Sequence, residues 1–342
     1  MRKKNKFVRM LIAVLSAMIF SLMVLGGRLF TNIEEDTFVS EEEDRIVVGM
    51  SQLGSESGWR TANTESVQNV FTQQNGYFLI FHNARQRQEN QIKAIRSFIS
   101  QRVDYIVFAP VVETGWETVL QEAKEAGIPV ILMDRNVDVK DKSLYVTRVG
   151  SNFVEEGERA GRWLEDYLSR HGKDDETVNI VVLKGTQGSS SQIGRTAGFS
   201  SVAALHGNWY IMEQEYADFT SAKGKEVMES FLRKYPDIDV VVSQNDDMTF
   251  GAIEAIRESG RTVGIGGDIT IISFDAVHAA LEMVAEGTIN VDIECNPNQG
   301  EVLSRVIGML EDGEEVEQQY YVEEDVFTIK NVTQEVLQKR NY

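Results

Sequence analysis

Cysteine and histidine are scarce in this chain, and their scarcity removes several kinds of site. The 342 residues include one cysteine, Cys295, so an intrachain disulfide and a cysteine-cluster metal site are excluded. Cys295 also lies too far along the chain to be the lipid-modified cysteine of a bacterial lipoprotein. The four histidines are scattered and no Asp-x-Asp-x-Asp-Gly loop occurs, so we expect no zinc or calcium site.

Nucleotide-binding fingerprints are also missing. The glycine- and serine-rich run at 185–191 lacks the Gly-Lys-Ser/Thr ending of a phosphate-binding loop. The glycine cluster at 264–267 precedes a predicted strand, whereas a dinucleotide fingerprint would follow one, so we interpret it as a turn. We therefore expect no cofactor.

Basic residues are outnumbered, with 34 Lys and Arg against 53 Asp and Glu and a net charge of −19. The first thirty residues carry six basic side chains and no acidic one, so the remainder is more acidic still. Such a body is repelled by DNA, RNA and anionic lipid surfaces. We therefore expect no nucleic-acid partner.

The N-terminal region reads as a targeting element followed by a spacer. A basic start is followed at 10–27 by an apolar run that is about the minimum for a membrane span and long for a signal peptide. Residues 1–30 are therefore either a cleaved signal peptide or a membrane anchor, and in both cases the rest of the chain lies outside the cytoplasm. Residues 31–44 hold seven acidic side chains and predict an extended, self-repelling stalk.

From Arg45 onward, short apolar runs alternate with segments of helical period, which predicts a βαβ series. We expect strands near Val47 and at 77–81, 105–109, 130–134 and 145–149, and helices that start near Trp59, Glu89, Trp116 and Phe153. The series repeats with strands at 179–183, 210–214, 240–243, 269–274 and 289–293. The sequence therefore predicts an α/β protein with two similar doubly wound parallel-sheet lobes.

Polar side chains follow many of these strands. Ligands of doubly wound sheets bind beyond the carboxyl ends of the strands, so two such lobes place the site in the cleft between them. The charged and amide side chains that follow the strands can form hydrogen bonds with adjacent hydroxyl groups of a ligand. Trp59 and Phe219 can lie flat on the apolar face of a ring. The run at 185–191 would add backbone amides and hydroxyl groups. This mixture favours a neutral polyol such as a sugar over a nucleotide.

Four runs carry a family resemblance. They are SQLGSESGWR at 51–60, QENQIKAIRSFISQRVDYIVFAPVVETGW at 88–116, DFTSAKGKEVMESF at 218–231 and NDDM at 245–248. The chain from about Ile46 to its end resembles the periplasmic sugar-binding proteins of ABC importers, of the type I, ribose/galactose-like group, and within them the galactofuranose binders.

The resemblance implies a hinge and a set of ligand contacts. Chain crossings near Gly150, Glu294 and Gln318 would make one lobe of 45–150 with 295–318 and the other of 151–294 with 319–342. The implied ligand-binding residues are Ser55, Glu56, Trp59, Arg60, Asn83, Asp134, Arg135, Arg195, Phe219, Asn245, Asp275 and Glu294. Replacing Arg195 or Asp275 by alanine is then expected to weaken binding without lowering the stability of the ligand-free chain.

Four of these residues also have explanations that need no ligand. Glu56 and Arg60 are four apart and could pair on the first turn of a helix. Asp275 could cap a helix that begins at Val277, and Phe219 could be plain core. These alternatives stay open.

The expected function is that of a monomeric extracytoplasmic solute-binding protein that captures a hexose, such as galactofuranose, and delivers it to an ABC permease. The stretch His82–Arg85 departs from the acidic, glycine-containing loop of the galactofuranose binders, and Ala109, where ribose binders place an asparagine, argues against ribose. The alternative is a membrane-tethered sugar sensor for a histidine kinase or chemoreceptor, indicated by the N-terminal run and the stalk. Enzymatic glycoside cleavage is not expected, because no second acid is marked as the proton donor.

Overall fold

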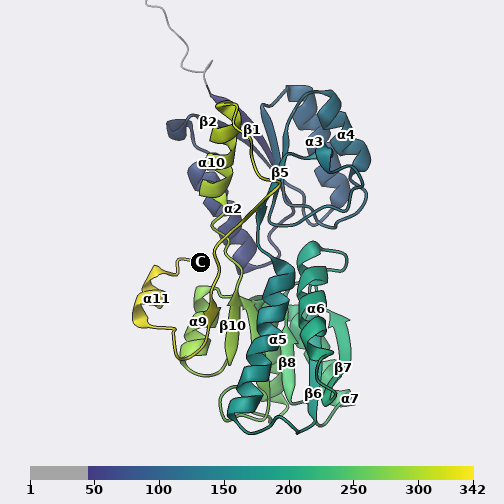
Figure 1. The fold of residues 1–342 in the computed structure, drawn as a ribbon, viewed down its shortest axis with the longest axis vertical. Helices are drawn as coiled ribbons and strands as arrows, with labels where there is room; N and C mark the ends of the chain where they lie inside the picture. Colours follow the sequence, from purple (N-terminus) through teal and green to yellow (C-terminus); the bar gives the residue numbers. More distant parts are fainter. Residues whose placement is uncertain (1–44) are drawn as a thin grey trace, which may run out of the picture. The chain divides into compact units, whose positions relative to one another are not determined.

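A computed structural model describes residues 45–342 (Figure 1). The signal peptide or anchor expected at 1–30 and the stalk expected at 31–44 lie outside the described residues. Within 45–342, no helix has both the length and the apolar composition that a membrane crossing requires.

The strands form two separate six-stranded sheets, each the centre of one lobe, which confirms the predicted two-lobed α/β fold. The first sheet has the order β11-β5-β4-β3-β1-β2, and every neighbouring pair in it is parallel. Its strands are β1 (Ile46–Gln52), β2 (Tyr77–Asn83), β3 (Tyr105–Phe108), β4 (Val130–Met133), β5 (Thr147–Gly150) and β11 (Gln319–Tyr321).

Apolar residues cover both faces of the first sheet, as a buried parallel sheet requires. Successive residues of one strand serve different cores, since Ile106 packs under one pair of helices and Val107 under the other. One face is covered by α3 (Gln88–Gln101) and α4 (Glu117–Glu125), the other by α2 (Gly58–Val70) and α10 (Gly300–Glu311), and the short 3₁₀ helices Gln73–Asn75 and Lys142–Leu144 lie in connections (Figure 1).

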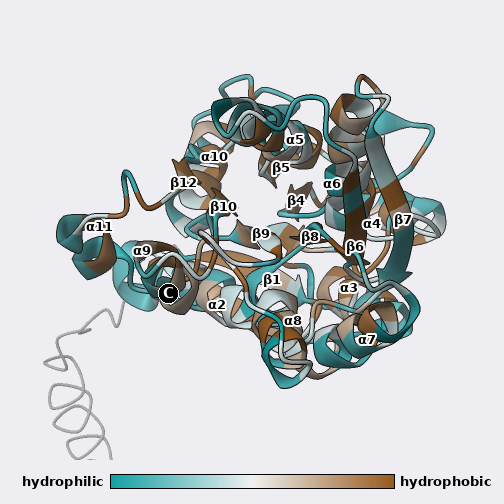
Figure 2. Cartoon of the chain, turned by 90° about the horizontal axis from the view of Figure 1, so that it is seen from below, coloured by the Kyte–Doolittle hydropathy of each residue, from teal (hydrophilic) through white to brown (hydrophobic). Residues whose placement is uncertain are grey.

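The second sheet has the order β12-β10-β9-β8-β6-β7, and only its edge strand β12 is antiparallel to its neighbour. Its strands are β6 (Val178–Lys184), β7 (Trp209–Tyr216), β8 (Val240–Ser243), β9 (Thr270–Asp275), β10 (Val291–Glu294) and β12 (Val326–Phe327). The helices of this lobe are α5 (Phe153–Arg170), α6 (Ser190–Ala203), α7 (Ser221–Lys234), α8 (Asp246–Glu258), α9 (His278–Ala285) and α11 (Gln334–Lys339). Figure 2 shows apolar strands such as β8 in brown, whereas α7 carries both brown and teal residues, as expected for a helix with one buried face.

The chain passes between the lobes after Gly150, after Glu294 and after Tyr321. The third crossing was expected near Gln318 and lies later, because Gln319–Tyr321 pairs in parallel with β5 of the first sheet. The first two crossings are short segments that follow the carboxyl ends of β5 and β10, so the hinge adjoins the edge of each sheet where a ligand would bind.

Candidate functional site

A pocket lies between the carboxyl ends of the two sheets. It is lined by Glu56, Ser57, Trp59, Arg60, Asp134, Arg135, Phe153, Ser191, Arg195, Phe219, Asn245, Asp275 and Cys295. These residues come from both lobes and from two of the three crossings, so the pocket exists only when the lobes are together.

The loop after β1 places three pocket residues through a helix cap. Ser57 precedes α2, and its hydroxyl accepts a hydrogen bond from the backbone N–H of Arg60 at 3.1 Å. This cap fixes the start of the helix, so Glu56, Trp59 and Arg60 enter the pocket from one turn of chain. The indole N–H of Trp59 donates to the carbonyl oxygen of Cys295 in the second crossing.

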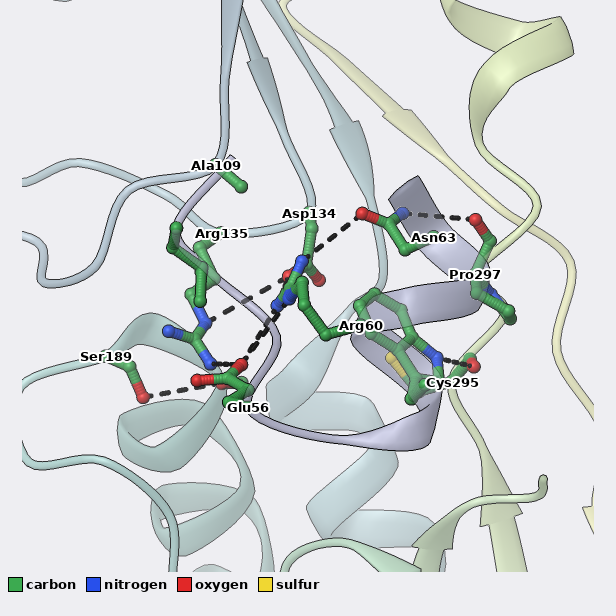
Figure 3. Close-up of polar contacts among 12 residues, drawn as sticks. Glu56, Arg60, Asn63, Ala109, Asp134, Arg135, Ser189, Cys295 and Pro297 are labelled. Atoms are coloured by element: carbon green, nitrogen blue, oxygen red, sulfur yellow. Dashed lines mark hydrogen bonds and ion pairs between the residues drawn. The ribbon is translucent and has the colours of Figure 1, made fainter. Parts of the chain in front are cut away.

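Two arginines and two acids of the first lobe form a buried network (Figure 3). Arg60 contacts Asp134 at 2.5 Å, Arg135 contacts Glu56 at 2.5 Å, and Arg60 also lies 3.4 Å from Glu56. All four side chains are at most 5% exposed, so these are charge-assisted bonds at low dielectric. Within the described residues the Nε–H of Arg135 has no acceptor, which leaves one buried donor for a ligand oxygen.

The turn that carries Asp134 depends on a glycine. Asp134 has a φ of +60°, and its carbonyl oxygen accepts two hydrogen bonds from Arg148, at 2.9 and 2.6 Å. A Cβ at Gly150 on the adjacent strand would lie 2.7 Å from that same oxygen. Glycine is therefore required where β5 ends beside the turn that aims Asp134 into the pocket.

In the second lobe, Arg195 is the centre of a matching network. Its Nε donates to Glu156 at 2.6 Å, one terminal nitrogen donates to Asp275 at 3.1 Å, and the other donates to the carbonyl oxygen of Gln244. Burial raises the pKa of Asp275 well above its ordinary range, although the charge of Arg195 opposes this shift. Arg195 therefore compensates two carboxylates that have left water.

Phe219 supplies an aromatic face to the pocket. Its ring lies against the backbone of Gly185, where a Cβ would come within 1.8 Å of the ring. The guanidinium carbon of Arg135 in the first lobe lies 5.2 Å from the centroid of this ring, a cation–π contact between the lobes.

Backbone groups at the rim of the pocket also join the lobes. The N–H of Gly58 donates to Asp247 at 3.2 Å, and the N–H of Asn136 donates to the hydroxyl of Ser190 at 2.8 Å. The N–H of Glu113 donates to the carbonyl oxygen of Gly188 at 3.0 Å. The structure is thus the closed arrangement of the two lobes.

The structure gathers nine of the twelve predicted site residues in this pocket. They are Glu56, Trp59, Arg60, Asp134, Arg135, Arg195, Phe219, Asn245 and Asp275. Two of the open alternatives also hold in part, since Glu56 does pair with Arg60 and Phe219 does belong to a core cluster. Asp275 does not cap the next helix, because the residue before α9 is Val277, which makes no side-chain cap.

Three predicted residues lie elsewhere. Ser55 is exposed and is not among the residues that line the pocket. Asn83 is exposed, and its side chain accepts the N–H of Arg85 within its own turn. Glu294 binds Arg340 and accepts the hydroxyl of Tyr342 at 3.0 Å, so the C-terminal residues occupy it.

Four lining residues were missed, and only one left a signal in the sequence. Ser57 is recognisable as a cap before the first helix. Ser191 was noted only as part of a glycine- and serine-rich run, while Phe153 and Cys295 lie at chain crossings, where the apolar pattern gives no hint of a pocket.

Asn245 lines the pocket and also bonds within its own lobe. Its carbonyl oxygen accepts the N–H of Met248 at 3.0 Å as the cap of α8, and its amide donates to the carbonyl oxygen of Phe219 at 3.3 Å. Asn245 therefore holds the turn that presents the Phe219 ring.

Among residues 45–342 one group has a spacing that suits a metal ion. Glu156, Cys295 and Glu324 offer ligand atoms within 4.8 Å of one another at the hinge. Arg195 already neutralises Glu156, and burial raises the pKa of the Cys295 thiol well above its ordinary range. A protonated thiol is a poor ligand, so this group is better described as a hydrogen-bonded hinge cluster.

Two lobes that close over a pocket built from both define a two-lobed α/β binding protein. A family model described as the periplasmic binding protein domain matches residues 48–315, and the chain belongs to that family. The resemblance seen in the sequence is thereby confirmed.

Individual relatives cover most of the chain. It is 46% identical over 256 residues to the galactofuranose-binding protein YtfQ of Escherichia coli (strain K12). This aligned region covers 74% of this chain and 78% of that protein. A protein from Mycobacterium smegmatis, solved in complex with beta-D-fucofuranose, is 44% identical with a TM-score of 0.82, over 87% of this chain and 95% of that one. The periplasmic component of the arabinose ABC transporter from Shewanella sp. ANA-3, bound to alpha and beta-L-arabinofuranose, is 43% identical with a TM-score of 0.80, over 86% and 95%.

Proposed function

We propose that this chain is an extracytoplasmic solute-binding protein that captures one monosaccharide in its furanose form and delivers it, chemically unchanged, to an ABC importer. The observation that carries the proposal is the pocket itself, in which two arginine–carboxylate networks and an aromatic face meet between closing lobes. The ligand-binding roles of the nine lining residues are part of this proposal.

The charge balance of the pocket favours a neutral ligand. Each buried arginine faces carboxylates of its own lobe, as Arg60 faces Asp134, Arg135 faces Glu56 and Arg195 faces Asp275. A phosphorylated or carboxylated sugar would add an anion beside these acids with no cation left to receive it. Hydroxyl groups donate and accept, so they can use the carboxylate oxygens and the unpartnered Arg135 Nε together.

The size of the ring is supported by the relatives. Galactofuranose, fucofuranose and arabinofuranose, the sugars in the three names above, share a five-membered ring and differ in their exocyclic carbons. The ring plane would lie on Phe219 or Trp59, with its hydroxyl groups on the two networks. The expectation of a hexose is therefore widened to furanoses, with galactofuranose among them.

Delivery to a permease follows from the same family and needs no chemistry in the pocket. Glu56, Asp134 and Asp275, the acids that could serve a glycosidase, are each bound to an arginine and serve as acceptors. The sensor alternative depended on residues 1–44, which lie outside the described chain, and we do not propose it.

The test is calorimetry of the ligand-free protein against L-arabinose, D-galactose, D-fucose, D-fructose and D-ribose. Carbon-13 NMR of the bound labelled sugar then reports its ring form. We expect heat from at least one of the first three sugars, a bound furanose and full recovery of unaltered sugar. No heat from any sugar refutes the proposal, and a bound pyranose refutes its furanose part.

A further inference from the structure

The turn after β9 has an unusual backbone. Asp275, which faces the pocket, has a φ of +108°, and the next residue, Ala276, has a φ of +58°. Residues other than glycine rarely adopt such values, and they persist only where the surroundings hold them. The groups that hold this turn therefore also determine where Asp275 points.

Two buried acids hold the turn. The N–H of Ala276 donates to Asp292 Oδ1 at 3.1 Å, and the N–H of Val277 donates to Asp246 Oδ2 at 2.8 Å. Asp246 begins α8, Asp292 lies in β10, and both are 0% exposed. Neither lines the pocket.

Because these two acids accept the N–H groups of consecutive residues, their carboxyl groups lie on the same turn, and little positive charge is nearby. Asp246 Oδ1 accepts the hydroxyl of Ser273 at 2.5 Å, whereas Asp292 Oδ2 has no basic partner among the described residues. Asp275 on β9 adds further negative charge. Arg340, from the C-terminal segment, is the cation that acts on Asp292, and it is itself bound to Glu294.

Two adjacent buried carboxylates cannot both be ionised at low cost, and a shared proton lets one donate to the other. Burial raises the pKa of Asp292 to about 7, and burial together with the charge of Asp292 raises the pKa of Asp246 well above its ordinary range. Both carboxyl groups therefore hold a proton more readily than ordinary aspartates do, and one proton between them relieves their mutual repulsion.

We propose that Asp246 and Asp292 are positioning residues of the sugar site, which share one proton and thereby hold the turn that presents Asp275 to the ligand. The inference rests on the proposed function for its ligand and on the two N–H contacts for its mechanism. Loss of the shared proton places two charges side by side, so the turn loosens and sugar affinity falls.

The variants separate the proton from the shape of the side chain. Asp292→Asn keeps an oxygen for the Ala276 N–H and supplies a permanent N–H to Asp246, whereas Asp292→Ala supplies neither. Asp239→Asn is the matched control, because Asp239 also accepts a backbone N–H, that of Asn179 at 2.8 Å, near the opposite end of the same sheet.

Affinity for L-arabinose and D-galactose is measured between about pH 7 and about pH 10, because the last proton of the pair is lost above the pKa of Asp292. We expect the affinity of the wild type to fall as pH rises, and the affinity of Asp292→Asn to change little with pH. Asp292→Ala should lose affinity about tenfold or more at every pH. Asp239→Asn should behave like the wild type. A pH-dependent Asp292→Asn variant, or unaltered affinity in Asp292→Ala, overturns the proposal.

A measurement without sugar keeps this test separate from that of the proposed function. Difference infrared spectra of the ligand-free protein near neutral pH should show, beside the absorption of other protonated carboxyl groups such as Glu324, a protonated carboxyl band that Asp292→Asn removes and Asp239→Asn keeps. If the band responds as expected but no sugar binds, the shared proton stands and the proposed function fails. If sugar binds and the band is absent, the proposed function stands and the shared proton fails.

Discussion

Removing Arg195 should destabilise the ligand-free chain as well as weaken binding. Arg195 is 3% exposed, and in its place a methionine would fill much of the space of the side chain while removing the charge. Glu156 and Asp275, 1% and 4% exposed, would then be left as buried acids without their cation. Burial thus changes the expectation drawn from the sequence, that substitution at Arg195 would leave stability unaltered.

The magnitude follows from the class of interaction. Breaking a buried ion pair by removing one partner costs about 3–5 kcal/mol, because the remaining charge stays out of water. The acids can take up protons, which limits the loss, so we expect Arg195→Met to lower the free energy of unfolding by about 3 kcal/mol at neutral pH. Adding Glu156→Gln removes one of the two stranded charges and should restore about 1 kcal/mol or more.

Urea unfolding of the ligand-free protein, followed by circular dichroism, measures both values. The four proteins of the cycle, with wild type, each single variant and the double variant, give the coupling between Arg195 and Glu156 directly. A loss below about 1 kcal/mol in Arg195→Met, or no coupling, would show that water reaches these carboxylates and would refute the description of the network as buried.

Three further predictions concern the hinge, the aromatic face and the C-terminus. Burial raises the pKa of Glu324 to about 9, so the unfolding free energy of the wild type should fall as pH rises from about 5 to about 9. Urea unfolding at several pH values should show a weaker pH dependence of this free energy for Glu324→Gln. Gly185→Ala should push the Phe219 ring out of place and reduce sugar affinity about tenfold or more in calorimetry, whereas Gly207→Ala, at an exposed glycine with no neighbour within 4 Å, is the matched control. Arg340→Ala should lower the melting temperature while sugar affinity stays within about twofold, because Glu294 is bound by the C-terminal segment and not by the ligand. A loss of affinity as large as that of Gly185→Ala would show that Glu294 belongs to the site.

The strands that could be predicted are those with a strong apolar pattern. The run at 240–243 is β8 as predicted, since four consecutive residues of this strand are buried between two layers of helices. Strands β11 and β12 are three and two residues long and only partly buried, and they form because a partner strand from elsewhere in the chain is available. Their pairing is a tertiary effect that a local pattern does not carry.

The same distinction separates the site residues that could be found from those that could not. Asp134 follows β4, Asn245 comes two residues after β8 and Asp275 ends β9, so their place at the open edge of a sheet follows from the order of elements. Glu294 also ends a strand, but Arg340, 46 residues later, returns to bind it. Cys295 enters the pocket only because the second crossing passes beneath Trp59, and no local feature of the sequence encodes that path.

The two charge networks explain how closure can be reversible. Glu56, Arg60, Asp134 and Arg135 pair within the first lobe, and Glu156, Arg195 and Asp275 pair within the second. Among the ion pairs between described residues none joins the lobes, so opening the cleft breaks no salt bridge and strands no charge.

What holds the lobes together without a ligand is a small set of neutral or weakly charged contacts. The Arg135–Phe219 contact is worth about 1 kcal/mol, and the rim hydrogen bonds of Gly58 and Asn136 are each worth a similar amount, because water replaces them on opening. A ligand that bonds to both networks adds the missing interactions across the cleft and shifts the equilibrium by its differential affinity for the closed form. The half-sites are therefore pre-built in each lobe, and a ligand completes the closed form by bonding to both.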